Sequence, residues 1–277
     1  MARRAKRASA VADRIGDEAA SNFRERNPGL RLAPVVAVIP AYNEEEALGG
    51  VLDEMPAEAC GLAVDTVVVD DGSADRTSEV AREHGAHVAR LAQNCGQGAA
   101  FRAGYRIARE HGADVIVTLD ADGQWAPSDI PTVLEPVVAD EADFVLGSRA
   151  LGRTETDDSF RQAGVHVFAT LVSRLSGTKV TDTSSGLRAM KAEITAAVRQ
   201  EQPQYQSSEL LLGAIFAGYR IAERPIVMRK RTAGVSKKGH NVLYGFRYAG
   251  VVLRTWWRDR GGRSRPAPQE APERVGA

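Results

Sequence analysis

The stretch Val115-Ile116-Val117-Thr118-Leu119-Asp120-Ala121-Asp122-Gly123-Gln124 places a short apolar run directly before two carboxylates separated by one residue. The apolar run is typical of a buried strand, so the acidic residues fall at the carboxyl end of that strand. Two carboxylates in this spacing can converge on one hard cation, and the Gln124 amide adds a neutral oxygen. Asp-x-Asp also occurs in ordinary turns, where carboxylates cap the following helix. Its position after a strand favours the cation site.

Outward from this stretch, strand and helix patterns alternate along the chain. Strands are expected at 35–40, 65–69, 88–91, 115–119 and 144–146, and helices at 44–55, 75–85 and 99–110. This alternation predicts an α/β fold in which helices flank a Rossmann-like, mostly parallel central sheet. Ligands of such sheets bind beyond the carboxyl ends of the strands.

Three polar clusters fall at those strand ends: Tyr42-Asn43-Glu44, Asp70-Asp71-Gly72-Ser73 and Asp120-Ala121-Asp122. Acidic clusters suit a divalent cation, a ribose hydroxyl or a base N–H. A turn with a helix cap explains Gly72 and Ser73, but two adjacent acids at the end of a buried strand cost free energy unless they are paired. The loop at 94–98 can approach a ligand closely because it carries glycines, although it does not match a P-loop.

Length and composition allow one sizeable core, since the chain has 277 residues and is 43% hydrophobic. Lys+Arg and Asp+Glu balance at 36 each, which gives no reason to expect a nucleic-acid partner. Cys60 and Cys95 lack disulfide or metal-ligand spacing, which favours a reducing compartment. No apolar run suits a signal peptide or a membrane span. We therefore expect a cytoplasmic protein, with peripheral contact at the membrane face left open.

Four motifs occur in a fixed order along the chain: Ile39-Pro40-Ala41-Tyr42-Asn43-Glu44-Glu45, Val69-Asp70-Asp71-Gly72-Ser73, Asn94-Cys95-Gly96-Gln97-Gly98-Ala99 and Leu119-Asp120-Ala121-Asp122-Gly123-Gln124. In this order and spacing they resemble the family-two glycosyltransferases, over residues 34–257. Further segments resemble the dolichyl-phosphate mannose/glucose synthase branch of that family: Gly147-Ser148-Arg149, Asp182 to Arg188, Ser208 to Leu211 and Arg231 to Lys237.

The resemblance implies a GT-A fold with an inverting, metal-dependent activity. A sugar would move from a nucleotide-sugar donor, of the GDP-mannose or UDP-hexose type, to an acceptor, which in this branch is a polyprenyl phosphate. The Gln-x-x-Arg-Trp motif of processive polysaccharide synthases is absent from the sequence, which favours a single transfer.

The resemblance also implies roles for individual residues. The nucleotide would be held by Pro40, Ala41, Tyr42, Glu44, Asp71, Gly98, Asp120 and Ala121. The cofactor, Mg²⁺ or Mn²⁺, would be held by Asp120, Asp122 and Gln124. The expected catalytic residues are Asp122, Arg231 and Arg149, with Arg231 on the leaving diphosphate. The acceptor phosphate would be contacted by Arg149, Arg161, Ser236 and Lys237. Gln97 stands where many relatives carry a basic residue, which leaves one diphosphate contact open.

The acceptor has alternatives. A phosphate is already ionised near neutral pH and needs no strong base, whereas a hydroxyl would need a positioned carboxylate, for which Glu209 is the candidate. One alternative is transfer of the sugar to a soluble small-molecule acceptor. A second alternative is a different reaction, the nucleotidyl transfer that makes sugar nucleotides. Nucleotidyltransferases usually carry a Gly-rich, basic signature after the first strand, where this chain has Pro40 to Glu44. Arg188 is expected to anchor the loop at 182–186.

We divide the chain into a mobile N-terminal arm (1–33), a catalytic domain (34–228), a basic loop with an amphipathic C-terminal helix (229–260) and a disordered tail (261–277). Between Arg220 and Arg265, only Glu223 and Asp259 oppose the many basic residues. Apolar and aromatic residues at 242–257 can share one helical face and arginines another. This helix either docks on the catalytic domain or contacts an anionic membrane through its tryptophans and arginines.

Overall fold

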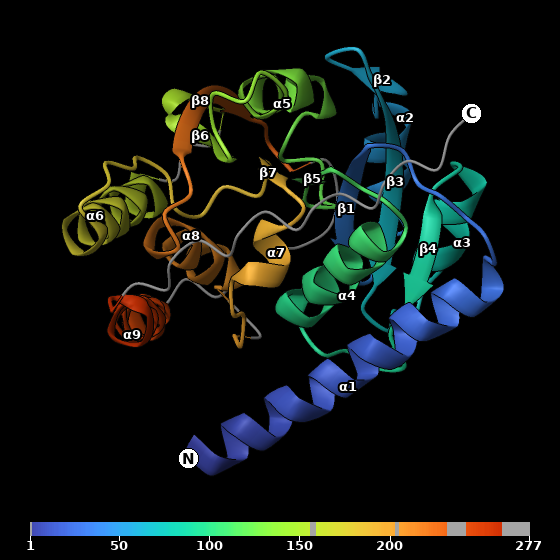
Figure 1. Cartoon of the computed structure of the whole chain (residues 1–277), viewed down its shortest axis with the longest axis horizontal. Coiled ribbons are helices and arrows are strands. Elements are labelled where there is room, and N and C mark those ends of the chain that lie inside the picture. The colour runs from blue at the N-terminus through green and yellow to red at the C-terminus, as the bar shows by residue number, and fades with distance from the viewer. Residues whose placement is uncertain (1, 156–158, 203–204, 232–241, 262–277) are drawn as a thin grey trace.

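The computed structural model describes residues 2–155, 159–202, 205–231 and 242–261, and the side chains at 2–8, 159–163 and 242–247 are outside that description. Within these residues one mixed sheet lies at the centre (Figure 1), with strand order β2-β3-β1-β5-β7-β6-β8 and β4 paired to β3. The strands are β1 (Val35–Ala41), β2 (Glu58–Ala59), β3 (Leu62–Asp70), β4 (His87–Arg90), β5 (Val115–Thr118), β6 (Phe144–Thr154), β7 (Arg188–Lys191) and β8 (Ile221–Met228).

Parallel pairing joins β1 to β3 and β5, β3 to β4, and β6 to β8, whereas β7 runs antiparallel to both β5 and β6. The predicted α/β fold with a mostly parallel sheet is therefore confirmed. The sequence patterns located β1, β3, β4, β5 and the start of β6, but not β2, β7 or β8.

Helices cover both faces of this sheet (Figure 1). They are α1 (Ala2–Arg26), α2 (Leu48–Asp53), α3 (Thr77–Glu83), α4 (Gln97–Glu110), the 3₁₀ turn η1 (Pro127–Asp129), α5 (Ile130–Val138), α6 (Ser159–Ser176), α7 (Ile194–Ala197), α8 (Gln206–Phe216) and α9 (Val242–Asp259). Alternate residues of β1 enter opposite cores, since Val36 and Val38 pack with α4 while Val35 and Ile39 pack with α2 and α5. Gly104 lets α4 lie close to β1, because a Cβ there would overlap Val38.

The structure differs from the mobile arm predicted for residues 1–33. From residue 9 onward α1 is a docked helix that buries Ala12, Ile15, Ala19, Ala20 and Phe23. Ion pairs fasten it to α4, including Arg102 with Asp13 at 2.7 Å and Arg106 with Asp17. The apolar stripe was missed because alanines make most of it and charged residues surround it.

The C-terminal helix α9 docks on α6 and α8. It buries Tyr248, Val251, Val252 and Thr255, and its Trp256 indole donates to the Leu175 carbonyl at 3.0 Å. Leu253 and Trp257, predicted to share the apolar face, instead lie outward. Among the helices that the structure describes, none combines the length and apolar character needed to cross a bilayer. The predicted tail lies, from residue 262, outside the described residues.

Candidate functional site

The carboxyl ends of β1, β3 and β5 meet at one edge of the sheet. Register pairs Ala41 with Asp70, and the Asp71 amide donates to the Ala41 carbonyl at 2.8 Å. β5 lies on the other side of β1, with Thr118 beside Val38. The three polar clusters predicted from the sequence therefore lie together, as strand order requires.

Asp70 is a structural acid. It is fully buried, one carboxylate oxygen accepts from the Ser73 amide at 2.7 Å, and the other accepts from the Ser78 hydroxyl and from Arg90 at 3.1 Å. These donors offset the cost of burying its charge. Asp70 thereby fixes the turn that leads into α3.

Asp71 holds the loop at 94–98. Its two oxygens accept from the backbone amides of Cys95 at 2.7 Å and Gly96 at 2.8 Å. Burial raises the pKa of this carboxyl to about 6, with a further contribution from the charge of Asp70, although the two backbone hydrogen bonds act in the opposite direction. A carboxylate has about four acceptor positions, so two remain for a ligand.

Gly72 allows the two loops to meet. It has a φ of +75°, and a Cβ there would lie 2.6 Å from the carbonyl carbon of Gln93. Only glycine combines this positive φ with so close an approach. The loop at 94–98 is therefore held against the end of β3 from two adjacent positions.

Asp120 is held by two side chains from different segments. One carboxylate oxygen accepts from the Gln97 amide at 2.7 Å, at the start of α4, and the other from the Trp125 indole at 3.0 Å. Gly186 makes room for this arrangement, because a Cβ there would clash with both the Asp120 carboxylate and the Trp125 nitrogen. The sequence did not define a role for Gln97, and the structure shows that it donates a hydrogen bond to Asp120.

Asp122 forms an ion pair with Arg231, 2.6 Å between carboxylate oxygen and guanidinium nitrogen. Its other oxygen accepts from the backbone N–H of Gln124 at 3.1 Å. Arg231 reaches this site from the end of β8. The backbone N–H of Arg229 donates to the Gln124 carbonyl at 2.8 Å, and Met228 forms an isolated antiparallel β-bridge with Trp125. Asp122 and Arg231, both expected to be catalytic, therefore lie in direct contact, a pairing that the sequence did not predict.

The oxygen groups at this edge supply only part of the coordination shell of a hard divalent cation, so a bound substrate would have to supply the rest. No group of three His, Cys, Asp or Glu side chains able to hold a metal ion occurs within the described residues. Asp120 and Asp122 offer two carboxylates and Gln124 an amide oxygen, a donor set suited to Mg²⁺ or Mn²⁺ and unsuited to soft metals. Magnesium usually binds one or two carboxylates and completes its shell with water and substrate phosphate. The Arg231 guanidinium already balances Asp122 with positive charge.

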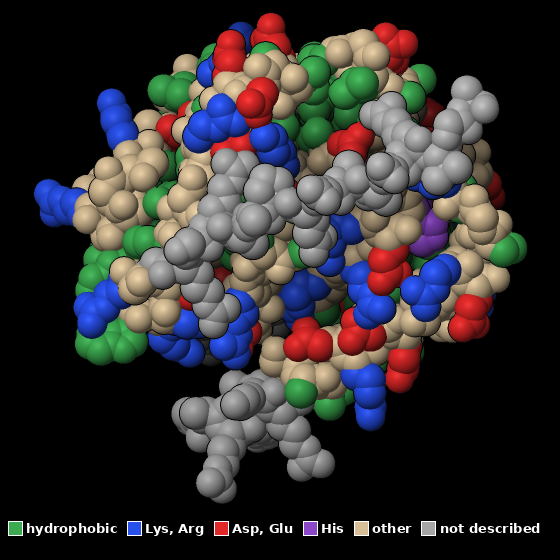
Figure 2. Space-filling model, viewed as in Figure 1, with side chains coloured by type: hydrophobic (Ala, Val, Ile, Leu, Met, Phe, Trp, Pro, Cys, Tyr) green, Lys and Arg blue, Asp and Glu red, His purple; other side chains and the backbone are tan. Residues whose placement is uncertain are grey.

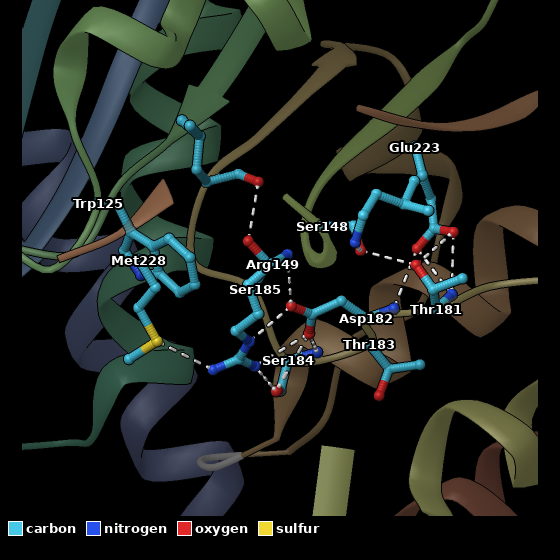
Figure 3. A network of polar contacts seen from close by, with 12 residues as sticks. Trp125, Ser148, Arg149, Thr181, Asp182, Thr183, Ser184, Ser185, Glu223 and Met228 are labelled. Carbon is cyan, nitrogen blue, oxygen red and sulfur yellow. Dashed lines mark hydrogen bonds and ion pairs between the residues drawn. The ribbon is translucent and has the colours of Figure 1, made fainter. Parts of the chain in front are cut away.

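Arg149, expected to be catalytic and to contact the acceptor phosphate, lies in a buried ion pair with Asp182 (Figure 3). Its guanidinium binds both oxygens of Asp182, at 2.7 and 3.0 Å. The third nitrogen is 3.3 Å from the Met228 sulfur, and the Trp125 ring centroid lies 5.5 Å from the guanidinium carbon. Glu223 holds Thr181, the residue before Asp182, because the Thr181 backbone N–H donates to the Glu223 carboxylate at 2.8 Å. The role of Arg149 toward an acceptor stays a prediction.

Glu209, the alternative base, is fully buried. Its carboxylate accepts from the amides of Glu201 at 2.8 Å and Gln202 at 3.0 Å, and pairs with Arg258 at 2.9 Å. This environment argues against a base that reaches a substrate. Arg188, expected to anchor the loop at 182–186, donates instead to the Ser207 carbonyl at 3.1 Å.

The remaining predicted residues divide by position. Pro40, Ala41, Gly98 and Ala121 are buried at or beside the strand ends, and Tyr42 and Glu44 are half-buried in the loop after β1. Arg161 lies in α6 with its side chain outside the described part, and Ser236 and Lys237 lie outside the described residues. Trp125 and Asp182 were missed, because their partners are set by loop curvature and strand order.

Comparison with known proteins gives one family. Residues 36–199 match the sequence model described as Glycosyl transferase family 2. An uncharacterised protein of Methanocaldococcus jannaschii is 34% identical over 77% of this chain and 88% of its own. A dolichyl-phosphate hexose transferase of Haloferax volcanii is 37% identical over 73% of this chain and 86% of its own. An undecaprenyl-phosphate mannosyltransferase of Micrococcus luteus is 32% identical over 76% and 89%.

A solved structure supports the fold. The glucosyl-3-phosphoglycerate synthase of Mycobacterium tuberculosis, in complex with Mn²⁺, UDP-glucose and phosphoglyceric acid, has a TM-score of 0.64 and 20% identity, covering 86% of this chain and 84% of its own. At this identity the likeness concerns the fold alone.

Proposed function

This chain belongs to glycosyl transferase family 2, and from that premise we propose that it transfers a sugar from a nucleotide sugar to a polyprenyl phosphate, with inversion at the anomeric carbon. The observation that carries the proposal is the meeting of Asp71, Asp120 and Asp122 at one sheet edge, with Arg231 on Asp122. Relatives named as dolichyl- and undecaprenyl-phosphate transferases support the acceptor class.

The nucleotide would lie against the ends of β1 and β3. Asp71 is a buried carboxyl group there, and with a pKa of about 6 it is ionised at neutral pH and able to accept from a base N–H or a ribose hydroxyl. Pro40, Ala41, Tyr42, Glu44, Gly98 and Ala121 would form the surrounding walls. GDP-mannose and UDP-hexoses are the donor types that we propose.

Asp120, Asp122 and Gln124 would hold Mg²⁺ or Mn²⁺. When bound, such a cation supplies Lewis-acid neutralisation of the charge on the leaving diphosphate. Arg231 would donate to the same diphosphate and add a fixed positive charge. Gln97 and Trp125 orient Asp120 for this role. The Mn²⁺ complex of the glucosyl-3-phosphoglycerate synthase, which shares the fold, is consistent with the assignment.

The acceptor would be a phosphate rather than a hydroxyl. A phosphate monoester is ionised near neutral pH, so its oxygen attacks without a strong base. Glu209 is engaged with Arg258 and two backbone amides, which leaves it unsuited to serve as that base. Arg149, Arg161, Ser236 and Lys237 would contact the acceptor phosphate. Since a polyprenyl chain resides in a bilayer, we also propose peripheral contact between the protein and a membrane surface.

A donor screen tests the proposal. Purified protein would be given UDP- and GDP-sugars with Mg²⁺ or Mn²⁺, with and without a short-chain polyprenyl phosphate, and products read by mass spectrometry. We expect a glycosyl phosphate lipid that forms only when donor, cation and lipid phosphate are all present. Transfer to 3-phosphoglycerate in place of the lipid would instead assign a soluble acceptor. Release of a sugar 1-phosphate, with the nucleoside monophosphate moved to the acceptor phosphate, would assign nucleotidyl transfer.

A further inference from the structure

Arg188 is a buried arginine whose hydrogen-bonding capacity is largely unused. The residue is 2% exposed, and its Nη1 donates to the Ser207 carbonyl at 3.1 Å. Its Nε and Nη2 have no hydrogen-bond partner, and in the described part of the chain only one other buried side-chain nitrogen or oxygen shares that condition, Oε1 of Gln200. Figure 2 shows the usual situation, in which Lys, Arg, Asp and Glu side chains spread over the surface and water solvates their charge.

The burial of Arg188 costs free energy that no contact within the fold offsets. Burial lowers the pKa of its guanidinium, while the charges of Asp182 and Asp120 act in the opposite direction. Neither carboxylate accepts from Nε or Nη2, since Asp182 is held by Arg149 and both oxygens of Asp120 accept from other side chains. A buried donor without an acceptor destabilises a protein, and a charged donor does so more strongly. Features that lower stability in this way commonly mark a functional site.

A small cavity joins Arg188 to the candidate site. Its volume is about 20 Å³, which is enough for one oxygen atom with the size of a water molecule. Besides Arg188, the cavity is lined by Asp120 and Gln97, which are half-buried, and by Ser184, which is exposed. The cavity therefore leads from the edge that carries the acidic residues to the buried guanidinium.

Strand order places this cavity where the sugar of a bound donor would lie. β7 runs antiparallel to β5, and Arg188 at its start pairs with Thr118 at the end of β5. Across the sheet the strands follow the order β3, β1, β5, β7 and β6 (Figure 1). In the proposed function the nucleotide lies on β3 and β1, the diphosphate at the end of β5, and the acceptor phosphate at Arg149 of β6. The sugar connects the diphosphate to the acceptor, so it falls beside β7.

We propose that Arg188 is a specificity-determining residue for the donor sugar, and that the cavity receives one hydroxyl oxygen of that sugar, which accepts from Nε and Nη2. These two nitrogens lie side by side on the planar guanidinium, so one oxygen can accept from both. A site whose buried donors need an acceptor discriminates strongly against a sugar that lacks it. The inference rests on the proposed function for the path of the donor along the sheet. It goes beyond that function by naming a residue that selects the sugar.

Calorimetric titrations separate recognition of the sugar from recognition of the nucleotide. Wild type and Arg188→Met would be titrated with UDP and UDP-glucose, and with GDP and GDP-mannose, each with Mn²⁺ and without acceptor. We expect Arg188→Met to weaken binding of the nucleotide sugar by roughly 10- to 100-fold, the effect of a hydrogen bond to a charged group. The matching nucleoside diphosphate should bind as it does to wild type. Arg188→Lys keeps the charge and a donor, and should recover part of the loss.

Donor analogues that each lack one hydroxyl group identify the oxygen in the cavity. One analogue should bind to wild type more weakly by the same factor, and Arg188→Met should weaken that analogue no further, because both changes remove the same contact. Equal affinities for all analogues would show that the cavity holds a trapped water only, and would overturn the proposal.

Thermal melts separate this role from a structural one. Arg188→Met removes a buried charge with unpaired N–H groups, so we expect its Tm to equal or exceed that of wild type. Arg109→Met is the matched control, because it removes a half-buried arginine near the other end of α4, bonded to Thr195, and should bind every ligand like wild type. A lower Tm for Arg188→Met with equal weakening of diphosphate and nucleotide sugar would assign a structural role. Unchanged binding of the nucleotide sugar would exclude the contact.

Transfer to a polyprenyl phosphate is measured separately, so the two proposals can fail independently. If nucleotide-sugar affinity depends on Arg188 but wild type transfers sugar to no lipid phosphate, the proposed acceptor is wrong and this inference stands. If wild type transfers the sugar and Arg188→Met leaves both kcat/KM and donor affinity unchanged, the proposed function stands and this inference is wrong.

Discussion

The acid pair at the end of β3 and the acid pair after β5 are alike in sequence and different in surroundings. Asp70 and Asp71 are held mainly by backbone amides and short side chains of neighbouring turns. Asp120 and Asp122 are held by the ends of Gln97, Trp125 and Arg231, which are longer side chains. The first pair is therefore part of a fixed frame, whereas the second pair has partners that can exchange for a ligand.

Asp122→Asn should have the largest effect and tests the exchangeable pair. Replacing the carboxylate removes the charge that would bind the cation, so we expect transfer to fall by about 10³-fold. Stability should fall by only about 1 kcal/mol, because Asn keeps an oxygen that can accept from Arg231, although the pair is only 20% and 11% exposed. Initial rates and thermal melts measure the two effects. Glu54→Gln, which breaks the adjacent exposed pair with Arg229, is the matched control and should retain the rate.

Asp70→Ala should act on stability instead. Its removal leaves the Ser73 amide and the Ser78 hydroxyl without their buried acceptor. We expect the free energy of unfolding to fall by about 3 kcal/mol, and Tm by about 6–12 °C. Calorimetry measures both, with Glu83→Ala as the control because it breaks only an exposed pair. Unchanged stability would show that Asp70 does not stabilise the turn after β3.

The raised pKa of Asp71 predicts a pH dependence for nucleotide binding. If the ionised carboxylate contacts the nucleotide, affinity should be constant above pH 7 and fall as the pH drops through about 6, approaching tenfold per unit. The contribution of Asp71 to folding stability changes with pH in the opposite direction. Because the folded protein binds this proton more tightly than the unfolded chain, the stability from this group is highest below pH 4 and is lost as pH rises toward 6. Titration calorimetry with UDP and GDP, wild type against Asp71→Asn, measures the difference; a fall centred near pH 4 would contradict the assignment.

Gln97→Ala should have the smallest effect. One of two hydrogen bonds to Asp120 is lost while Trp125 still holds the other oxygen, so we expect kcat/KM to fall by about fivefold. Gln97→Lys keeps a donor at this position and should restore most of the loss. If both variants behave like wild type, Asp120 is oriented by Trp125 alone.

The predictable part of the fold was the half in which local pattern decides structure. β1, β5 and the end of β3 are buried and parallel to one another, and their apolar runs are each followed by a polar cluster. β7 has the sequence Arg-Ala-Met-Lys and becomes a strand only because it is paired on both sides. α1 was missed because alanines form most of its buried stripe.

The site, too, was predictable only where its residues lie close together in the sequence. Asp120 and Asp122 lie two residues apart, so their shared position follows from one strand. The Arg149–Asp182 pair spans 33 residues and the Arg231–Asp122 pair spans 109, and both depend on strand order. The sequence predicted a role for three of these four residues, quoted Asp182 only as the start of a motif, and could not show how they pair. It therefore could not show that Arg149 is already engaged by a buried carboxylate.

With the ligands of the proposed function, the contact between Arg231 and Asp122 would couple two binding events. A cation alone would have to compete with a guanidinium for Asp122, and a diphosphate alone would meet a guanidinium that is already neutralised. A diphosphate that drew Arg231 toward itself would release Asp122 for the cation, so each ligand would remove the obstacle to the other. By thermodynamic linkage the two affinities would rise by the same factor. The resting protein would thus bind cation and nucleotide sugar weakly apart and tightly together, which keeps the charge of the site balanced at every stage.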